Sequence, residues 1–567
     1  MSKDKKVATA VIKNPKTLYD KFENWAAKND KKLFYFLIGL TLFLSFISFN
    51  ARISEAHDDA LYLEGGWRFV HEFPTYFYTQ NAPLYPLFLG LLIKLMGFKL
   101  IIFKLFSLIF NVLGVILFYK ALKGKVPAVI FIPVAIFQAA NHLIIYYASM
   151  TFTEAFYFCL QGLFFFYSVK IIEIVFKDGV QLKPQLKLWL MFGLSMFLIG
   201  TAKSSAIVVV PAVLLFFIVY KNYKAAGMSV LAYLSFKIPY ELIVKLVWGN
   251  QNQFKGQSKI LLQKDPYNAS LGNEDTAGFV QRFFDNCNLY LGKRFYQLLG
   301  WRDENMAFDP EKTPFDHFGY VTIITIALIL TGFWLLFKQK NKLLVLLTLF
   351  TGAQAFLSFV ILQARWDQAR IVLVCMPVFL ILMLYVFYNF TKKPGIGQSV
   401  YFVIAFLIVG SVCISSFKRG FKNIPIVSKN LKGDTYYGYT PDWQNFLKCS
   451  AWCADSLPAN TLVASRKAPM SFVYGKGKKF FPIYSIIKKD TATQQSNPDS
   501  ALAFFQKNKV THVMLGSLRL DPNNPNAGFI NTVHNIMQPI AVKYPQKLKL
   551  VHTEGFAEET QVYQIIY

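Results

Sequence analysis

Two adjacent carboxylates, Asp58 and Asp59, follow closely after the first long apolar run of the sequence. Adjacent acids beside a membrane are costly unless they cap a helix, bind a cation or handle a proton. If one of them handles a proton, it could take that proton from an attacking hydroxyl or amine. The plainer alternative is that one Asp only caps the helix that follows, and the pair alone does not decide between the two.

Other charged residues stand at the ends of later apolar runs. Glu154 belongs to Thr151-Phe152-Thr153-Glu154, which has the form of a capping box, so a capping role and a site role both stay open. Lys203 ends a run, where it could bind an anion or only extend its stem toward the membrane surface. Arg365 and Arg370 precede a further run, and a planar guanidinium can grip phosphate or carboxylate oxygens bidentately.

The elements that carry these residues are apolar and long. The chain of 567 residues is 54% hydrophobic and only 16% charged, against roughly 25% charged for a soluble domain. A membrane span needs roughly 20 apolar residues. Eleven runs reach or approach that length: 33–50, 100–119, 126–141, 152–175, 188–203, 205–220, 228–248, 318–337, 343–362, 371–391 and 399–417. We therefore expect an all-α polytopic membrane protein, which excludes a purely soluble enzyme.

The positive charges also fit a membrane protein. The formal net charge of +28 could suggest a nucleic-acid partner, but most of the cations flank apolar runs, where the bilayer explains them. Lysine-rich connections are expected inside, which places a cytoplasmic tail at 1–32 and the transmembrane domain at 33–417. The long loops 51–99 and 249–317 then lie outside. Each is predicted to hold an interfacial helix, and the first of these is a short apolar stretch over 84–97.

The C-terminal region, 418–567, loses the long apolar runs. Strand-like pieces at 461–465, 512–515 and 562–566 alternate with predicted helices at 441–456 and 500–507. This alternation predicts a small extracytoplasmic α/β domain. The predicted location of the whole chain is a bacterial inner membrane, with the N-terminus in the cytoplasm.

Arginine is confined to one predicted side of the membrane, whereas the inner loops use lysine alone. The outer face could use guanidinium groups to bind phosphate or carboxylate, or each arginine could merely pair with a loop acid. The arginines are Arg52, Arg68, Arg282, Arg294, Arg302, Arg365, Arg370, Arg419, Arg466 and Arg519.

The order of the motifs resembles the GT-C membrane glycosyltransferases, particularly glycosyltransferase family 39, which includes protein O-mannosyltransferases and the lipid A aminoarabinose transferase. Members of that family carry Asp-Glu-x-x-Tyr and then a Pro-Pro-Leu-Tyr-like segment in their first outer loop. This chain has Asp58-Asp59-Ala60-Leu61-Tyr62 and then Ala82-Pro83-Leu84-Tyr85. The segment from Ile144 to Glu154 resembles the family's Tyr-Ser…Glu segment.

Two later segments continue the resemblance, and some positions depart from it. The run from Gly193 to Lys203 is similar to a Gly-rich span that ends in Thr-Arg, and Trp366 to Arg370 is similar to an Arg-Tyr element. The departures are Asp59 in place of Glu, Lys203 in place of Arg, and Asn81 where aminoarabinose-type members have a phosphate-contacting Lys.

The resemblance implies an enzyme that moves a monosaccharide from a polyprenyl-phosphate donor to a glycan, lipid or protein acceptor outside the membrane. Asp58 would be the general base, with Asp59 as its neighbour or as a cation ligand. Lys203, Arg370 and, less directly, Arg365 would neutralise the leaving phosphate. Substrate contacts would come from Tyr62, Asn81, Tyr85 and Glu154. Some relatives use a divalent cation such as Mg²⁺ or Mn²⁺, whereas family 39 relatives generally need none.

The sequence leaves two other classes of protein open. A transporter or lipid flippase should show ionisable residues in the middle of spans or broken helices in matched halves, and the sequence contains no related halves. A non-catalytic assembly factor could keep the bundle without the chemistry, although the presence of both Asp58 and Asp59 argues against it.

Overall fold

The computed structural model describes residues 16–56, 58–249, 251, 257–266, 271–302, 319–393, 395–490, 493–520, 526 and 528–567. The chain divides into two compact units. The first comprises Met1–Phe49, Pro74–Tyr85 and Ile101–Ile424, and the second comprises Asn50–Phe73, Pro86–Leu100 and Pro425–Tyr567.

The first unit is a helical bundle, and every predicted apolar run is helical in it. Its long helices are α2 (Asp30–Ile47), α5 (Leu100–Leu122), α6 (Ala128–Ala140), α8 (Thr153–Asp178), α9 (Leu182–Ala202), α10 (Val209–Val219), α11 (Tyr223–Trp248), α15 (Tyr320–Lys338), α16 (Lys342–Ile361), α18 (Met376–Phe390) and α19 (Ile396–Leu431). Among the described residues, α5, α8, α9, α15, α16 and α19 are long and apolar enough to cross a membrane. The shorter apolar helices are α6, α18, α4 (Leu84–Met96) and the stretch Ser204–Val219, which contains α10.

Shorter elements connect these helices. They are α1 (Leu18–Lys28), α7 (His142–Tyr147), η1 (Ser204–Val208), α12 (Gln257–Leu262), α13 (Thr276–Cys287), the π-helical turn η3 (Asn288–Arg294), α14 (Phe295–Leu298), η4 (Ala364–Trp366) and α17 (Arg370–Leu373). Helix α1 is the amphipathic N-terminal helix, and Thr17 and Asp20 close a capping box at its start.

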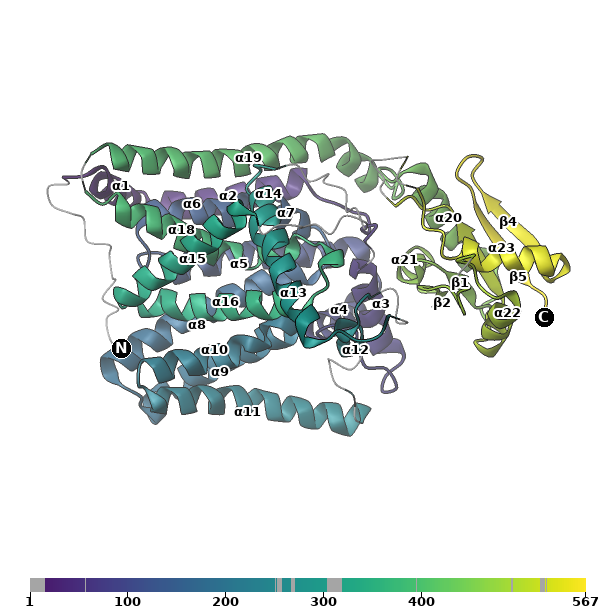
Figure 1. Ribbon diagram of the computed structural model, residues 1–567, viewed down its shortest axis with the longest axis horizontal. Coiled ribbons are helices and arrows are strands. Elements are labelled where there is room, and N and C mark those ends of the chain that lie inside the picture. Colours follow the sequence, from purple (N-terminus) through teal and green to yellow (C-terminus); the bar gives the residue numbers. More distant parts are fainter. Residues whose placement is uncertain are drawn as a thin grey trace. The chain divides into compact units, whose positions relative to one another are not determined.

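The centre of the bundle is aromatic. Figure 1 shows α8 and α16 running along each other in the middle of the unit. The ring centroid of Phe164 on α8 lies 5.8 Å from that of Phe192 on α9 and 5.1 Å from that of Phe350 on α16. These three rings are fully buried. Inside a membrane the hydrophobic effect does not drive helices together, so close packing of this kind must hold them.

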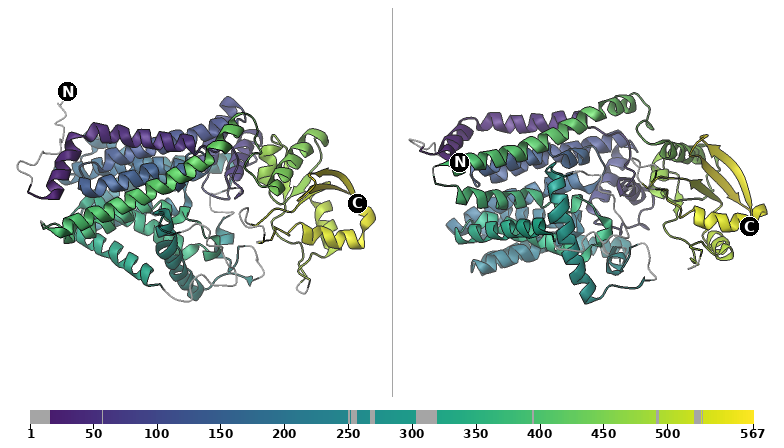
Figure 2. Two further views of the ribbon diagram at one scale, coloured as in Figure 1. Left: turned by 90° about the horizontal axis from the view of Figure 1, so that it is seen from above. Right: turned by 45° about the horizontal axis from the view of Figure 1, so that its top comes forward.

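Helix α13 differs in direction from the bundle helices. It runs across their long axes in Figure 1 and in both views of Figure 2. One side of the helix is buried, with Arg282, Asn286 and Cys287, whereas Val280 and Phe284 are exposed, as expected for a helix that lies in a membrane surface. The helix predicted in the second loop is therefore present in the structure.

The second unit combines two helices of the first loop with the C-terminal region. Its helices are α3 (Asp58–His71), α4 (Leu84–Met96, from Pro86), α20 (Pro441–Ser456), α21 (Ala468–Tyr474), α22 (Pro498–Lys507) and α23 (His534–Lys543), with the short turn η6 (Pro545–Lys547). Helices α3 and α4 meet at two glycines, because a Cβ on Gly66 would lie only 2.9 Å from the backbone nitrogen of Gly90.

A mixed sheet of five strands forms the centre of the C-terminal region. The strands are β1 (Val463–Ser465), β2 (Phe480–Pro482), β3 (His512–Gly516), β4 (Leu548–Glu554) and β5 (Thr560–Ile565), in the order β2-β1-β3-β5-β4. Strand β1 is parallel to β2 and β3, whereas β5 is antiparallel to β3 and β4. The predicted small α/β domain is confirmed, although β2 and β4 were not foreseen.

Helices cover both faces of this sheet. Val513 of β3 packs in a core with Phe505 of α22 and Ile536 of α23. The next residue, Met514, points to the other face and contacts Ser450 of α20 through its sulfur. Alternation of side chains along β3 thus gives each face its own helical layer.

Candidate active site

In the first unit, three of the predicted residues meet in one buried cluster. The Lys203 ammonium lies 3.0 Å from Oε1 of Glu154, and an Arg370 guanidinium nitrogen lies 3.9 Å from the same oxygen. The side chain of Glu154 is 1% exposed, and those of Lys203 and Arg370 are 16% and 15% exposed. One carboxylate and two cations leave the cluster with a formal charge of +1, which suits an anionic ligand.

The cluster assembles where helices begin and end. Glu154 lies in the first turn of α8, Lys203 ends α9 in an extended conformation, and Arg370 begins α17. The proposed capping box is wrong: the N-cap of α8 is Phe152, which makes no side-chain cap hydrogen bond. Glu154 binds cations from two other elements, Lys203 at the end of α9 and Arg370 at the start of α17. Lys203 correspondingly turns into the bundle to pair with it.

A second layer of polar groups surrounds the cluster. Tyr157, one turn after Glu154, lies with its ring 5.6 Å from the Lys203 ammonium. Its hydroxyl donates to Oε1 of Gln354 at 2.8 Å, and the amide of Gln354 donates to Ser205 Oγ at 3.2 Å. The buried polar groups on α8, α16 and η1 are thus joined by hydrogen bonds, as burial requires.

The loop that carries Arg370 is held by another arginine. Arg294, the last residue of the π-helical turn η3, pairs with Asp367 through two guanidinium nitrogens. Asp367 has a φ of 23°, which is unusual for a residue other than glycine. The ion pair with Arg294 fixes this conformation three residues before Arg370. The side chain of Arg365 lies outside the described residues.

Two predicted substrate residues and one unforeseen lysine lie elsewhere in the first unit. The Tyr85 hydroxyl lies 3.3 Å from Ser107 Oγ, and its ring packs on Phe156. Asn81 is half-buried, three residues before α4. Lys104 is fully buried in α5 and donates to the backbone oxygen of Ser149 at 2.9 Å. A lone lysine inside an apolar helix is a signal that could have found it in the sequence.

In the second unit, Asp58 and Asp59 form the first turn of α3, and their surroundings differ. Asp58 is half-buried, whereas Asp59 is fully buried. The carboxylate of Asp59 accepts from Ser54 N–H and Ser54 Oγ, each at 2.9 Å, and from Ala60 N–H at 3.0 Å. Tyr62 is buried one turn after Asp58. Asp59 thus fixes the start of α3, and Asp58 is the more accessible acid.

Replacing Asp59 by alanine is therefore expected to destabilise the folded protein by about 2–4 kcal/mol, because the buried Ser54 N–H and hydroxyl lose their acceptor. Ser54→Ala removes one of these bonds and should cost about 1 kcal/mol. Thermal unfolding of the two variants in nanodiscs checks the order. Equal melting temperatures for Asp59→Ala and wild type would show that these hydrogen bonds do not stabilise the fold.

Residues of the C-terminal region lie close to this acidic turn, and two of them, Lys467 and Tyr484, are not among the residues predicted from the sequence. Lys467 and Arg466 follow β1, and Tyr484 follows β2. The Arg466 guanidinium lies 5.8 Å from the centre of the Tyr484 ring. Burial raises the pKa of Tyr484 to about 12, and the negative charges of Glu64 and Asp58 act in the same direction. No local sequence pattern predicts a functional role for these residues, because only the fold brings them close to α3.

Several of the remaining arginines pair with acids, as the plainer alternative predicted. Arg68 pairs with Glu72, Arg282 with Glu274, Arg294 with Asp367, and Arg519 with Glu558. Arg282 is buried and also donates to backbone oxygens of Leu261, Gln263 and Ile361. Arg282, Arg294 and Arg519 thus hold separate segments together, whereas Arg370 belongs to the buried cluster.

A possible metal centre can be tested on the side chains that the structure describes. Among them, no group of three His, Cys, Asp or Glu residues comes together as metal ligands. Both oxygens of Asp59 already accept hydrogen bonds from Ser54 or Ala60. The described residues therefore offer no set of three such ligands for a cation at Asp59.

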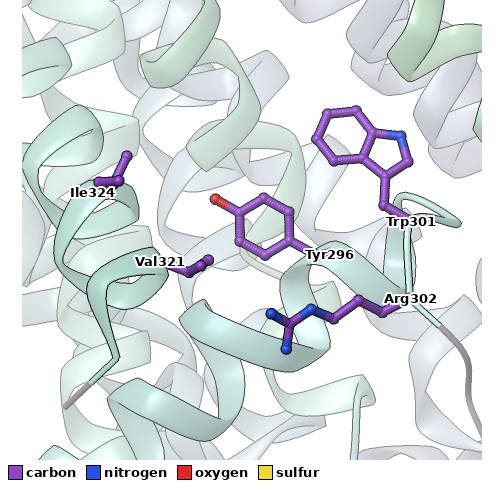
Figure 3. A pocket seen from close by; sticks show the side chains of 5 residues that line it. All are labelled: Tyr296, Trp301, Arg302, Val321 and Ile324. Carbon is purple, nitrogen blue, oxygen red and sulfur yellow. The ribbon is translucent and has the colours of Figure 1, made fainter.

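A pocket of about 290 Å³ opens elsewhere in the first unit, between the end of α14 and the start of α15 (Figure 3). Tyr296, Trp301, Arg302, Val321 and Ile324 line it. The Trp301 indole N–H donates to Ser411 Oγ at 2.9 Å. None of the predicted site residues is among those that line this pocket, and its aromatic and aliphatic walls are typical of the membrane surface.

The fold is similar to that of solved membrane proteins. ArnT from Cupriavidus metallidurans in the apo state is 11% identical, with a TM-score of 0.51 over 94% of this chain and 97% of that one. The same protein bound to undecaprenyl phosphate is 11% identical, with a TM-score of 0.51 over 94% and 98%. An oligosaccharyltransferase from Archaeoglobus fulgidus in complex with Zn and sulfate is 12% identical, with a TM-score of 0.55 over 85% and 68%.

These similarities define the class of fold. The chain has the fold of the GT-C membrane glycosyltransferases, and together with its apolar helices this makes it an integral, multi-pass membrane protein. The predicted fold class is confirmed, and the predicted resemblance is confirmed at the level of the fold. Neither a protein-family model nor a curated protein matches the sequence.

Proposed function

We propose that this protein is a glycosyltransferase that moves one monosaccharide from a polyprenyl-phosphate carrier to an acceptor on the outer side of the membrane. The observation that carries the proposal is the buried cluster of Glu154, Lys203 and Arg370 within a GT-C fold. Undecaprenyl phosphate is bound in a structure of ArnT, and we propose a carrier of the same chemical class here.

The cluster supports the proposal through its charge. Glu154 holds Lys203 and Arg370 in place, so the two cations need not reorganise when a phosphate arrives. A phosphate oxygen would neutralise the excess positive charge of the cluster. The positive charge stabilises the transition state more than the ground state, because the leaving phosphate becomes more negative as its bond to the sugar breaks.

The proposed step is a single displacement at the anomeric carbon. Asp58 accepts the proton of the acceptor hydroxyl or amine, whose oxygen or nitrogen forms the new bond to that carbon. The bond between the anomeric carbon and the phosphate oxygen breaks, and its electron pair leaves with the polyprenyl phosphate. Asp58 then releases the proton to water. The configuration of the sugar is inverted by this step.

The surroundings of the two acids support Asp58 rather than Asp59 as the base. Asp59 is fully buried and its oxygens accept three hydrogen bonds, so it is suited to holding the start of α3. Asp58 is half-buried one residue earlier. Because the described residues offer no set of three His, Cys, Asp or Glu ligands for a cation at Asp59, no step of the proposal passes through Mg²⁺ or Mn²⁺.

The remaining assignments belong to the same proposal. Tyr62, Asn81 and Tyr85 would contact substrate, Arg365 would assist at the phosphate, and the acceptor would be a glycan, lipid or protein. The sugar would be a hexose or a pentose. The reaction would take place outside a bacterial inner membrane, on the side that carries the C-terminal region 418–567.

The test uses the purified protein in nanodiscs with a panel of polyprenyl-phosphate sugars and a membrane extract as the source of acceptor. We expect one donor to be consumed, with release of its polyprenyl phosphate. If the folded protein consumes none of the donors while the extract is present, the proposal is wrong and a transporter or assembly factor becomes the better hypothesis.

A further inference from the structure

Lys467 occupies a position at which α/β folds place functional residues. It lies two residues after the end of β1 and is the N-cap residue of α21. Strands β1 and β2 are parallel, so the residues after them, Lys467 and Tyr484, leave the same edge of the sheet. Ligand sites in such sheets lie at the carboxyl ends of parallel strands. Helix α3 packs on α21, which begins at that edge, with 5.2 Å between the ring centroids of Trp67 and Phe472.

The ammonium of Lys467 reaches the segment that leads into α3. It donates to the backbone oxygen of Glu55 at 3.0 Å, three residues before Asp58. The ring of Trp443 on α20 lies 5.5 Å from the same ammonium. A hydrogen bond on one side and an aromatic face on another hold the charge in one place.

Another donor from the C-terminal region holds the same segment without any charge. The Tyr439 hydroxyl donates to the backbone oxygen of Ile53 and lies 3.0 Å from the Tyr474 hydroxyl. Ser54, between Ile53 and Glu55, donates to Asp59. The segment is therefore restrained at consecutive residues, and what Lys467 adds beyond a restraint is its positive charge.

We propose that Lys467 is a positioning residue of the reaction, whose ammonium ties down the segment before Asp58 and orients the Asp58 carboxylate by charge. This inference rests on the proposed function, in which Asp58 is the base. It assigns the C-terminal α/β region a direct part in the chemistry, through a residue placed at the edge of its sheet.

The charged groups that act on Lys467 come from its own loop and from the start of α3. The pKa of Lys467 is lowered to about 8, mainly by burial and also by the neighbouring positive charge of Arg466. Asp58, Glu55 and Asp59 act in the opposite direction. Lys467 therefore carries its charge below about pH 8 and loses it above. If the charge orients Asp58, the rate of transfer must fall as the pH rises through that value.

Stability should respond in the opposite sense. The folded-state pKa lies below that of an unfolded lysine, so the buried charge costs stability at neutral pH, and this cost disappears as the pH rises. A residue that lowers stability at working pH is easier to explain by function than by folding. Lys467→Met is accordingly expected to melt at the same temperature as wild type or higher at neutral pH, while it loses activity.

The experiment compares rate against pH, from about pH 6 to about pH 10, for wild type, Lys467→Met, Lys467→Arg and two controls in nanodiscs. We expect the wild-type rate to decline above about pH 8. Lys467→Met should lose at least about 10-fold in rate at neutral pH. Lys467→Arg should keep most of the wild-type rate at neutral pH. Its rate should not decline above about pH 8, because a guanidinium stays charged throughout this range. Tyr439→Phe loses only a neutral restraint and should keep the wild-type pH profile.

Lys476→Met serves as a matched control, since it removes an exposed lysine of the same unit that pairs with Asp455 at 3.0 Å. It should behave like wild type. A wild-type rate that stays flat across the range overturns the inference, and so does a decline in Lys467→Arg equal to that of wild type. The wild-type profile decides even if a variant fails to fold. A wild type that consumes no donor overturns the proposed function itself, which is a different result.

Discussion

Asp58→Asn is expected to lower kcat for sugar transfer by about 10²- to 10⁴-fold, which is the usual contribution of a general base. The amide keeps the size of the side chain but cannot accept the proton of the acceptor. Asp58 is half-buried and lies one residue before the carboxylate that fixes the start of α3. The variant should therefore fold and melt nearly as the wild type does.

The measurement is a single-turnover reaction with labelled donor bound in advance, so that chemistry is separated from donor binding. Asp59→Asn is the natural comparison. It should lose stability, because its carboxylate holds Ser54, and its activity should fall with the folded fraction. If Asp58→Asn transfers sugar at the wild-type rate, the base lies elsewhere and the assignment of Asp58 fails.

Lys203→Met is expected to have two separate effects. Removing the ammonium leaves the buried Glu154 carboxylate without its nearest cation. Breaking a buried ion pair typically lowers the free energy of unfolding by about 3–5 kcal/mol. Because Arg370 remains near Glu154, we expect a smaller loss of about 2–3 kcal/mol. It also removes a cation from the leaving phosphate, and such donors are worth roughly 10²- to 10³-fold in kcat.

A second variant separates these two effects. Lys203→Met combined with Glu154→Gln restores the charge balance, so stability should return while transfer does not. Lys125→Met removes a lysine of the same unit from a more exposed pair with Glu173 and should change neither property by much. Recovery of transfer in the double variant would show that Lys203 serves only to neutralise Glu154.

The membrane bundle was predictable from the sequence because its signal is long. A run as long and apolar as 343–362 predicts a membrane-spanning helix. The helix found there, α16, is shifted by one residue at each end. Strand β2 has only three residues, and burial does not alternate regularly along β4. Neither segment therefore shows the alternating pattern from which a strand is predicted. Short strands depend on their neighbours for pairing, and the neighbours are far away in sequence.

The candidate site was only partly predictable, for a similar reason. The sequence shows Glu154, Lys203 and Arg370 only as separate charges at the ends of apolar runs. That both cations lie near the same oxygen of Glu154 is seen only in the structure. The capping box at 151–154 fails because α8 starts later than the motif predicts, which frees Glu154 for its ion pairs. Lys104 could have been noticed as a charge inside α5, whereas Lys467 could not, because a lysine in a polar loop carries no signal by itself.

The central claim is that the bond between sugar and phosphate is broken by this protein. The most direct test uses a donor labelled separately in its phosphate and its sugar, with the protein reconstituted in sealed vesicles together with acceptor. We predict that the two labels separate, with one polyprenyl phosphate formed for each sugar transferred, and that Asp58→Asn abolishes this separation. If instead the labels stay together and cross the bilayer equally well in wild type and Asp58→Asn, the protein moves its lipid without chemistry and the account is wrong.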